Sequence, residues 1–246
     1  MEADTKENSE EHEKKPRQIT VPGEIIVSGT QYLPGEYTRR EGQDIIATRY
    51  GLLEQNDRLF RIIPLSGVYL PRIGNTVIGK VIDITFNGWL LDINSPYHAF
   101  LTLAECRGFI SKKEDLSAIY NFGDMISTKI TNVKSKGVDV TMKDKGLHKL
   151  DEGMIITVNS NKVPRVIGKA GSMINMIKTE TGCNIIVGQN GVVWIRGENA
   201  AQELLAKEAI KMIVEKSFTD GLTEQVSSFL EKHRPKEKKE EKGEKE

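Results

Sequence analysis

The sequence predicts a multidomain protein of three modules, two of them rich in β-strands and one of the α+β class, between two charged tails. Three observations carry this prediction. Short apolar or alternating runs separated by Pro-Gly and Asn-Gly turns fill residues 19–147, a pattern typical of strands. Helical spacing of apolar residues begins only after residue 148. Both ends of the chain are highly charged and lack such periodicity.

Composition narrows the classes of protein to consider. The chain has 246 residues, with 35 Lys and Arg against 35 Asp and Glu, so its formal net charge is 0. This balance excludes a uniformly basic nucleic-acid coat protein and a strongly acidic chaperone. No run approaches the ~18 apolar residues of a membrane helix, and the N-terminus lacks the apolar core of a secretory signal. We therefore expect a cytoplasmic protein without a membrane partner.

The two tails are expected to be disordered. Residues 1–18 form a charged arm without periodicity, and residues 233–246 alternate acidic and basic residues. Because these segments have little apolar surface to bury, nothing offsets the entropy lost on ordering them.

Residues 19–73 are predicted to form a β-rich module. The expected strands are Glu24–Val27, Asp44–Thr48 and Arg58–Pro64, with turns at Pro-Gly dipeptides between them. Every basic residue of this module is an arginine, which suits bidentate pairing at an interface. Ordinary solvated strand faces explain the arginines equally well, so both interpretations stay open. The six are Arg39, Arg40, Arg49, Arg58, Arg61 and Arg72.

Residues 74–147 follow the plan of an OB-fold, a small five-stranded barrel. Asn87-Gly88 is a tight-turn dipeptide between the first two strands. A short helical stretch, Asp115–Tyr120, separates the third strand from the fourth. The five expected strands are Thr76–Thr85, Trp89–Ile93, Ala99–Leu103, Met125–Val133 and Val138–Met142.

Residues 148–232 change to the order βααββα. Asn199 is a plausible N-cap of the last of these helices, whose inward residues are expected to be Leu204, Leu205, Ile210 and Ile213. A later amphipathic run, residues 222–230, predicts a helix that covers this protein's own surface. The expected elements are Met154–Val158, Pro164–Gly182 with a break at its glycines, Cys183–Val187, Val192–Arg196 and Asn199–Val214.

The break between the first two helices is a G-x-x-G loop, Gly168-Lys169-Ala170-Gly171. Two glycines let a sugar–phosphate chain approach without a Cβ in the way. The next helix starts near Ser172, so its free N–H groups and positive dipole end face the same spot. Lys169 adds a mobile positive charge.

Inside βααββα, and followed by Thr181-Gly182-Cys183-Asn184-Ile185, this loop resembles that of the KH domain, which holds about four single-stranded nucleotides. The resemblance implies RNA contacts by the loop and the helix before it. A KH-shaped spacer with an unused loop is the alternative. The implied residues are Arg165, Gly168, Lys169, Ala170 and Gly171.

The barrel segment containing Phe86-Asn87-Gly88-Trp89 resembles the RNA-binding domain first seen in ribosomal protein S-one. The resemblance implies that Phe86 and Trp89 stack bases, at roughly 1–3 kcal/mol per base, although packing at the barrel end is the alternative. Thr102 stands where that family has a histidine, and residues 134–136 replace its usual Asp and Arg. These departures favour phosphate attraction over stacking. The basic candidates are Lys134 and Lys136, together with Arg107, Lys112 and Lys113, for which a solvated loop is an equally good explanation.

Signs of catalysis or of a cofactor are missing from the sequence. Cys106 and Cys183 lie in different modules and the four histidines are scattered, so neither a disulfide nor a metal site is predicted. The nucleophile-elbow and zinc-hydrolase motifs are absent. We therefore expect a protein that is not itself an enzyme and that needs no cofactor.

The order of the modules resembles the archaeal RNA-exosome cap subunits related to ribosomal-RNA-processing protein four. The resemblance covers residues 19–230 and includes Val21-Pro22-Gly23. It implies a trimeric cap of non-catalytic subunits on a ring of RNase-PH-like subunits, with the N-terminal module docked on the ring. It also implies that the cap feeds single-stranded RNA 3′ ends, A-rich RNA being favoured, to a phosphorolytic 3′→5′ exoribonuclease. A free-standing RNA chaperone or translation regulator with the same domains is the alternative.

Overall fold

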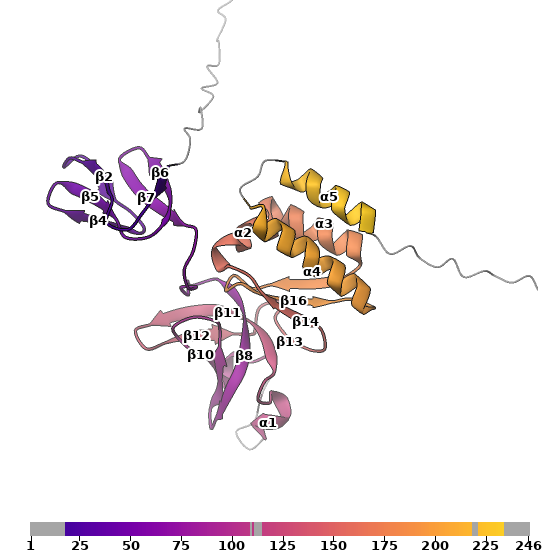
Figure 1. Ribbon diagram of the computed structural model, residues 1–246. Coiled ribbons are helices and arrows are strands. Elements are labelled where there is room, and N and C mark those ends of the chain that lie inside the picture. Colours follow the sequence, from indigo (N-terminus) through magenta and orange to yellow (C-terminus); the bar gives the residue numbers. More distant parts are fainter. Residues whose placement is uncertain (1–17, 109, 111–114, 218–220, 234–246) are drawn as a thin grey trace, which may run out of the picture. The chain divides into compact units, whose positions relative to one another are not determined.

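The computed structural model describes residues 18–108, 110, 115–217 and 221–233 (Figure 1). The arm before residue 18, most of the C-terminal tail, and Lys112 and Lys113 lie outside the described residues. The chain divides into two compact units after Ser66. This division precedes the sequence-based boundary at 73/74, because Tyr69 belongs to the core of the barrel and donates a hydrogen bond to Asn75 at 2.8 Å.

The first unit consists of two small sheets. One has the order β1-β6-β7-β3 and the other β2-β5-β4. Ile45, Phe60 and Ile62 are buried in this unit. The sequence indicated β2, β5 and β7. It missed the two-residue strands β1 and β3, the highly charged β4, and β6, whose apolar residues do not alternate. The strands are β1 (Ile19–Thr20), β2 (Ile25–Ser28), β3 (Leu33–Pro34), β4 (Thr38–Glu41), β5 (Asp44–Ala47), β6 (Gly51–Asn56) and β7 (Leu59–Pro64).

The second unit begins with a five-stranded barrel, as predicted. The barrel closes because β12 pairs in parallel with β10 and antiparallel with β11. The short helix α1 (Leu116–Ile119) lies between the third and fourth strands, and η1 (Leu103–Glu105) follows the third. The barrel strands are β8 (Thr76–Thr85), β9 (Gly88–Asp92), β10 (Ala99–Thr102), β11 (Met125–Lys134) and β12 (Gly137–Thr141), and β13 (Lys149–Leu150) extends the sheet beside β11.

The rest of the second unit has the predicted order βααββα with one further helix, α5. The helices pack together against the three-stranded sheet β14-β16-β15 (Figure 1). Asn199 caps α4 as predicted, because its Oδ1 accepts a hydrogen bond from Gln202 N at 2.9 Å. Leu204 was expected to point inward but is 47% exposed, so that prediction is wrong. The elements are β14 (Met154–Thr157), η2 (Ser160–Lys162), α2 (Val163–Ile167), η3 (Lys169–Gly171), α3 (Ser172–Thr181), β15 (Asn184–Val187), β16 (Val192–Arg196), α4 (Ala200–Glu215) and α5 (Leu222–His233).

The barrel and the helical domain meet through the turn between β15 and β16. Asn190 is fully buried there, and its Nδ2 donates to Ile78 O at 2.8 Å and to Ile93 O at 3.0 Å. Its Oδ1 accepts from Ile78 N at 3.3 Å. Ile78 also packs with Leu150, Val192 and Trp194 in a small core of its own. This junction holds the two parts of the second unit in one arrangement.

The described helices are all too short or too polar to cross a membrane. Within the described part of the chain, no three His, Cys, Asp or Glu side chains gather as a metal site would require. Burial raises the pKa of the Cys106 thiol to about 12, so this cysteine stays neutral near pH 7.

Candidate nucleic-acid interface

The loop between α2 and α3 depends on backbone conformations that favour glycine. Gly168 has φ 76°, and a Cβ built there would lie 2.7 Å from Met173 N, so no other residue fits without a shift. Ala170 and Gly171 also have positive φ values, 51° and 81°. These residues end α2 and turn the chain sharply into α3, which leaves the loop backbone open on one side.

This loop borders a pocket with a volume of about 440 Å³. Arg165 and Lys169 are exposed at its rim, and neither forms an ion pair with another described residue. No side chain caps the N-terminus of α3, and the N–H of Ser172 donates to Lys169 O, so the start of α3 offers an anion chiefly the positive end of the helix dipole. The pocket is lined by Pro164, Arg165, Gly168, Lys169, Ser172, Met173, Gly221, Leu222 and Thr223.

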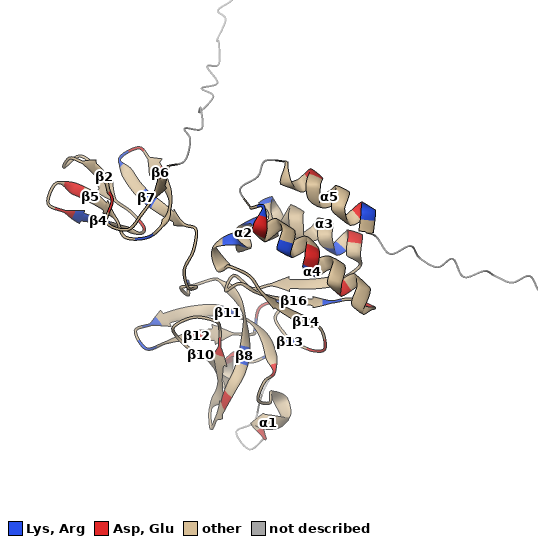
Figure 2. Ribbon diagram, viewed as in Figure 1, with Lys and Arg blue, Asp and Glu red and all other residues tan. Residues whose placement is uncertain are grey.

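The last three lining residues belong to the start of α5 or directly precede it, and sequence reasoning did not connect them with the loop. Leu222 packs with α4 and α3 in the helical core, which brings the N-terminal turn of α5 to the loop. No local sequence signal marks this contact, because it arises from packing between segments about 50 residues apart. Positive charge also dominates locally, since Arg165 is the one charged residue of α2, while α4 mixes both signs (Figure 2).

Trp89 does not lie on the surface of the barrel, and the prediction that it stacks a base is wrong. Its exposed fraction is 0%, and its Nε1 donates a hydrogen bond to Tyr120 O at 2.9 Å. Tyr120 contacts the indole edge-on with ring centroids 5.0 Å apart. The alternation within β9 contained this signal, since Leu91 is buried on the same face as Trp89 and Asp92 is exposed on the other.

Phe86 has the opposite environment. It is 90% exposed in the turn between β8 and β9, where nothing in the described part of the chain covers its ring. Phe122, in the turn before β11, is a second exposed aromatic side chain on the barrel, with 62% of its surface accessible. Exposed rings in barrel turns provide flat surfaces on which bases can stack.

A row of outward side chains crosses strands β8, β9, β10 and β12 of the barrel. We call Asp83, Leu90, Phe100 and Asp139 the outer row. The strand register aligns Asp83 with Leu90, Leu90 with Phe100, and Phe100 with Asp139. His98 precedes Phe100 by two residues and is exposed. No motif marks Phe100, His98 or Asp139 in the sequence, although the position of Asp139 between two valines of β12 indicates that it points outward.

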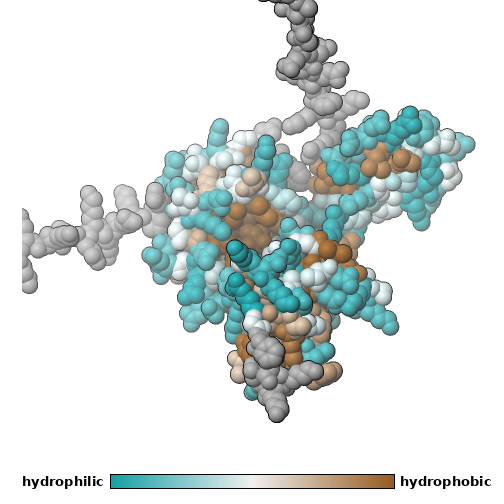
Figure 3. Space-filling model, turned by 180° about the vertical axis from the view of Figure 1, so that it is seen from behind, coloured by the Kyte–Doolittle hydropathy of each residue, from teal (hydrophilic) through white to brown (hydrophobic). Residues whose placement is uncertain are grey.

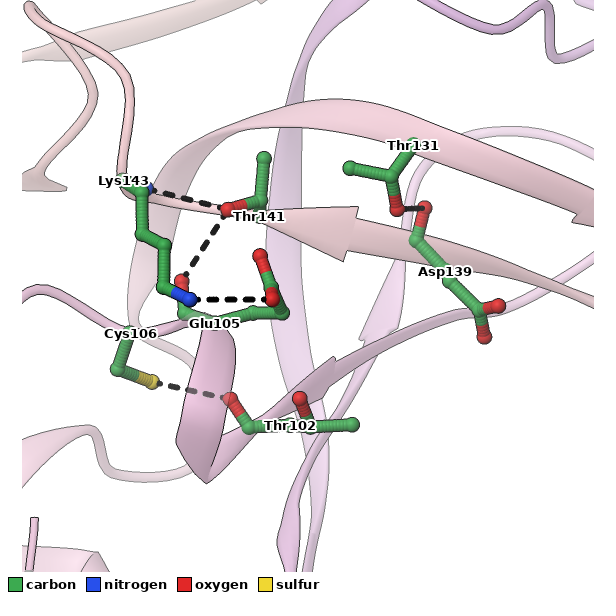
Figure 4. Close-up of polar contacts among 7 residues, drawn as sticks. All are labelled: Thr102, Glu105, Cys106, Thr131, Asp139, Thr141 and Lys143. Carbon is green, nitrogen blue, oxygen red and sulfur yellow. Dashed lines mark hydrogen bonds and ion pairs between the residues drawn. The ribbon is translucent and has the colours of Figure 1, made fainter.

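Three lysines on the barrel are paired with carboxylates. The Nζ atom of Lys134 lies 2.6 Å from Asp139 Oδ2, that of Lys129 lies 2.7 Å from Asp144 Oδ2, and that of Lys143 lies 3.2 Å from Glu105 Oε1. Figure 4 shows Lys143, Glu105 and Thr141 joined by hydrogen bonds in one cluster. A hydrogen bond from Thr141, and then the charge of Lys143, lower the pKa of Glu105.

Two of the predicted barrel cations remain without such a partner. Arg107 and Lys136 are exposed and form no ion pair with any described residue. The structure therefore brings Arg165, Gly168 and Lys169 together at one pocket and leaves Phe86, Arg107 and Lys136 as separate exposed groups on the barrel. Whether any of them contacts RNA stays a prediction.

Comparison with known proteins gives consistent matches. A profile of the KH domain matches residues 153–201. Exosome complex component Rrp4 of Thermococcus kodakarensis is 42% identical over 221 residues, covering 88% of this chain and 86% of its own length. Rrp4 of Picrophilus torridus is 42% identical over 218 residues, covering 88% and 93%. A crystal structure described as that of an exosome complex RNA-binding protein is 33% identical, with a TM-score of 0.62, and covers 68% of this chain and 98% of its own.

Proposed function

Because the chain belongs to the Rrp4 family of exosome complex components, we propose that it is a non-catalytic RNA-binding subunit of an exosome cap. In this role it captures single-stranded RNA 3′ ends, with A-rich RNA favoured. It passes them to a 3′→5′ phosphorolytic exoribonuclease ring of RNase-PH-like subunits. Three copies form the cap, and the assembly works in the cytoplasm.

The observation that carries the RNA-binding role is the pocket beside the G-x-x-G loop. Arg165 and Lys169 supply two positive charges without carboxylate partners among the described residues, and the start of α3 adds the positive end of its helix dipole. Phosphate oxygens bind to both cationic side chains and helix N-termini. Gly168 itself lines the pocket, and its positive φ lets the loop backbone turn there.

The barrel supplies the second proposed RNA surface. Phe86 stacks a base, while Lys136 and Arg107 attract phosphates. Lys134 contributes less, because Asp139 already offsets its charge. Lys112 and Lys113 keep their proposed role, although they lie outside the described residues. The Asn190 junction ties the barrel to the loop domain, so that both surfaces hold one strand at a fixed spacing.

The N-terminal unit is proposed to dock on the ring, mainly through apolar side chains. Arg39 and Arg61 form ion pairs with Glu41 and Glu54, and Arg40 donates to backbone carbonyls, so these arginines are already engaged within the unit. Figure 3 shows apolar surface on this unit, at the upper right, bordered by hydrophilic side chains. A partner that covers such side chains gains stability from their burial. The exposed apolar residues are Ile19, Val21, Ile25, Leu33 and Leu59.

The proposal can be tested with the full chain and the ring subunits from the same organism. We expect the chain alone to bind single-stranded RNA without degrading it, and to join the ring in a complex whose mass corresponds to three copies. The complex should degrade RNA faster than the ring alone. Degradation by the isolated chain would contradict the non-catalytic role, and RNA binding without association with the ring would favour a free-standing regulator.

A further inference from the structure

Asp139 is the member of the outer row whose carboxylate has one oxygen engaged and the other free. Lys134 Nζ lies 2.6 Å from Oδ2, and Asn132 Nδ2 donates to the same oxygen at 3.4 Å. The Thr131 hydroxyl donates to the backbone carbonyl of Asp139, and Figure 4 shows the carboxylate extending away from that hydroxyl. No described residue donates a hydrogen bond to Oδ1. One acceptor is therefore fixed in place and unused.

Phe100 lies directly across from Asp139 on the neighbouring strand. Both side chains are half-buried, while the residues on either side of each are buried, so both point outward. Adjacent strands are about 4.8 Å apart. A base stacked on the Phe100 ring therefore has its edge within reach of the Asp139 carboxylate.

The charges of the row favour a base over a phosphate. Asp83 lies at one end of the apolar pair formed by Leu90 and Phe100 and forms no ion pair with a described residue, so it repels a phosphate placed there, whereas Lys134 offsets the charge of Asp139. An ionised carboxylate can only accept hydrogen bonds. Adenine N6 and cytosine N4 are amino groups that donate to it, whereas uracil has an oxygen in the equivalent position.

We propose that Phe100 and Asp139 of the outer row form a base-selecting subsite, in which Phe100 stacks a base and Asp139 accepts a hydrogen bond from its exocyclic amino group. Adenine and cytosine then bind in preference to uracil. Lys134 and Asn132 hold Oδ2 and so orient the free Oδ1. This inference rests on the proposed function, because it requires single-stranded RNA on the barrel.

The test measures binding of the full chain to labelled oligo(A), oligo(C) and oligo(U) of equal length, at one salt concentration, by fluorescence anisotropy. Asp139→Ala should weaken oligo(A) and oligo(C) binding about tenfold and leave oligo(U) binding nearly unchanged. Asp139→Asn should shift the preference toward oligo(U), because an amide nitrogen can donate to the uracil oxygen. Repeating the series with Lys169→Asp and Ala170→Asp present separates the preference of the barrel from that of the loop.

Asp83→Ala is the matched control. Asp83 carries the same charge in the same row, but its strand partner is Leu90 and not an aromatic ring. Both variants raise the net charge by one, so a general electrostatic effect would appear in both. We expect Asp83→Ala to keep the ratio of oligo(A) to oligo(U) affinity.

Three results would overturn the inference. Equal weakening of all three oligomers by Asp139→Ala, together with a lower melting temperature, would show that Asp139 only stabilises the hairpin through Lys134. Absence of any preference in the unmodified chain would refute the subsite and leave the proposed function standing. Failure of the unmodified chain to bind any oligomer would refute the proposed function itself.

Discussion

At the scale of single residues, Phe86 and Trp89 have opposite environments although they are three positions apart in the chain. The ring of Phe86 is 90% exposed and that of Trp89 is fully buried. The turn at Asn87-Gly88 separates them. Phe86 lies in the turn after β8, whereas Trp89 is the second residue of β9 and points inward. The two aromatic residues that the sequence grouped as one stacking pair therefore have different roles.

Phe86→Ala should lower affinity for single-stranded RNA by roughly 1–3 kcal/mol, the value of one stacked base, with little change in melting temperature. Trp89→Ala should lower the free energy of unfolding by about 3–5 kcal/mol, because it opens a cavity in the barrel and leaves Tyr120 O without its donor. Anisotropy titrations and denaturant melts of both variants separate the two effects. An unstable Phe86→Ala variant would mean that this ring supports the fold.

The double variant Lys169→Asp and Ala170→Asp tests the loop without altering its glycines. Both residues are exposed, so folding should survive, and acidic residues before α3 suit its dipole. The two carboxylates repel an incoming phosphate and cancel the Lys169 charge. RNA affinity of the full chain should fall, and the salt dependence should decrease by about one phosphate contact. Unchanged affinity and salt dependence would identify the domain as a structural spacer.

At the scale of elements, the turn between β15 and β16 is part of a junction and not a free loop. Gly188 cannot be replaced by another residue without a shift, since a Cβ there would lie 2.9 Å from Ile78 N and 2.3 Å from Asn190 Oδ1. Gln189 N donates to Thr76 O at 2.8 Å beside it. The turn therefore forms backbone and side-chain hydrogen bonds with the start of β8.

Asn190→Ala should cost about 2–4 kcal/mol of unfolding free energy, because Ile78 O and Ile93 O lose their buried donor. Urea denaturation measures the loss. Asn94→Gly is the control, since Asn94 is exposed, its φ of 53° suits glycine, and its side chain makes a 3.4 Å bond to Asn190 O. Equal stability of the two variants would show that the apolar contacts of Ile78 and Trp194 alone hold the junction.

At the scale of the whole molecule, the two units permit a clean separation of docking from RNA binding. A chain lacking residues 1–66 keeps Tyr69, which belongs to the barrel core, whereas removal through residue 73 deletes it. The shorter truncation should bind RNA like the full chain but fail to join the ring in size-exclusion chromatography. The longer truncation should also melt at a lower temperature. Normal assembly of the shorter truncation would locate the docking surface in the second unit.

The sequence by itself determined most of the local structure. Thr76–Thr85 and Val192–Arg196 are strands with the predicted bounds, and Asn199 caps α4. The break in the helix at Gly168 was also predictable, because glycine adopts positive φ without steric cost. These features are local: strand alternation, turn dipeptides, helix caps and the G-x-x-G spacing each involve about ten residues or fewer. They can therefore be recognised in the sequence alone.

Only the tertiary structure decided which side of each strand faces the core and which distant segments meet. Trp89 points inward because the closed barrel covers that face of β9. Leu204 points outward because the packed helices leave its face of α4 free. The alignment of Phe100 with Asp139 depends on a parallel strand pairing between residues about 40 positions apart. The position of α5 beside the loop depends on helix packing. Such contacts have no local signature, since the free energy that selects them comes from burial summed over the whole unit.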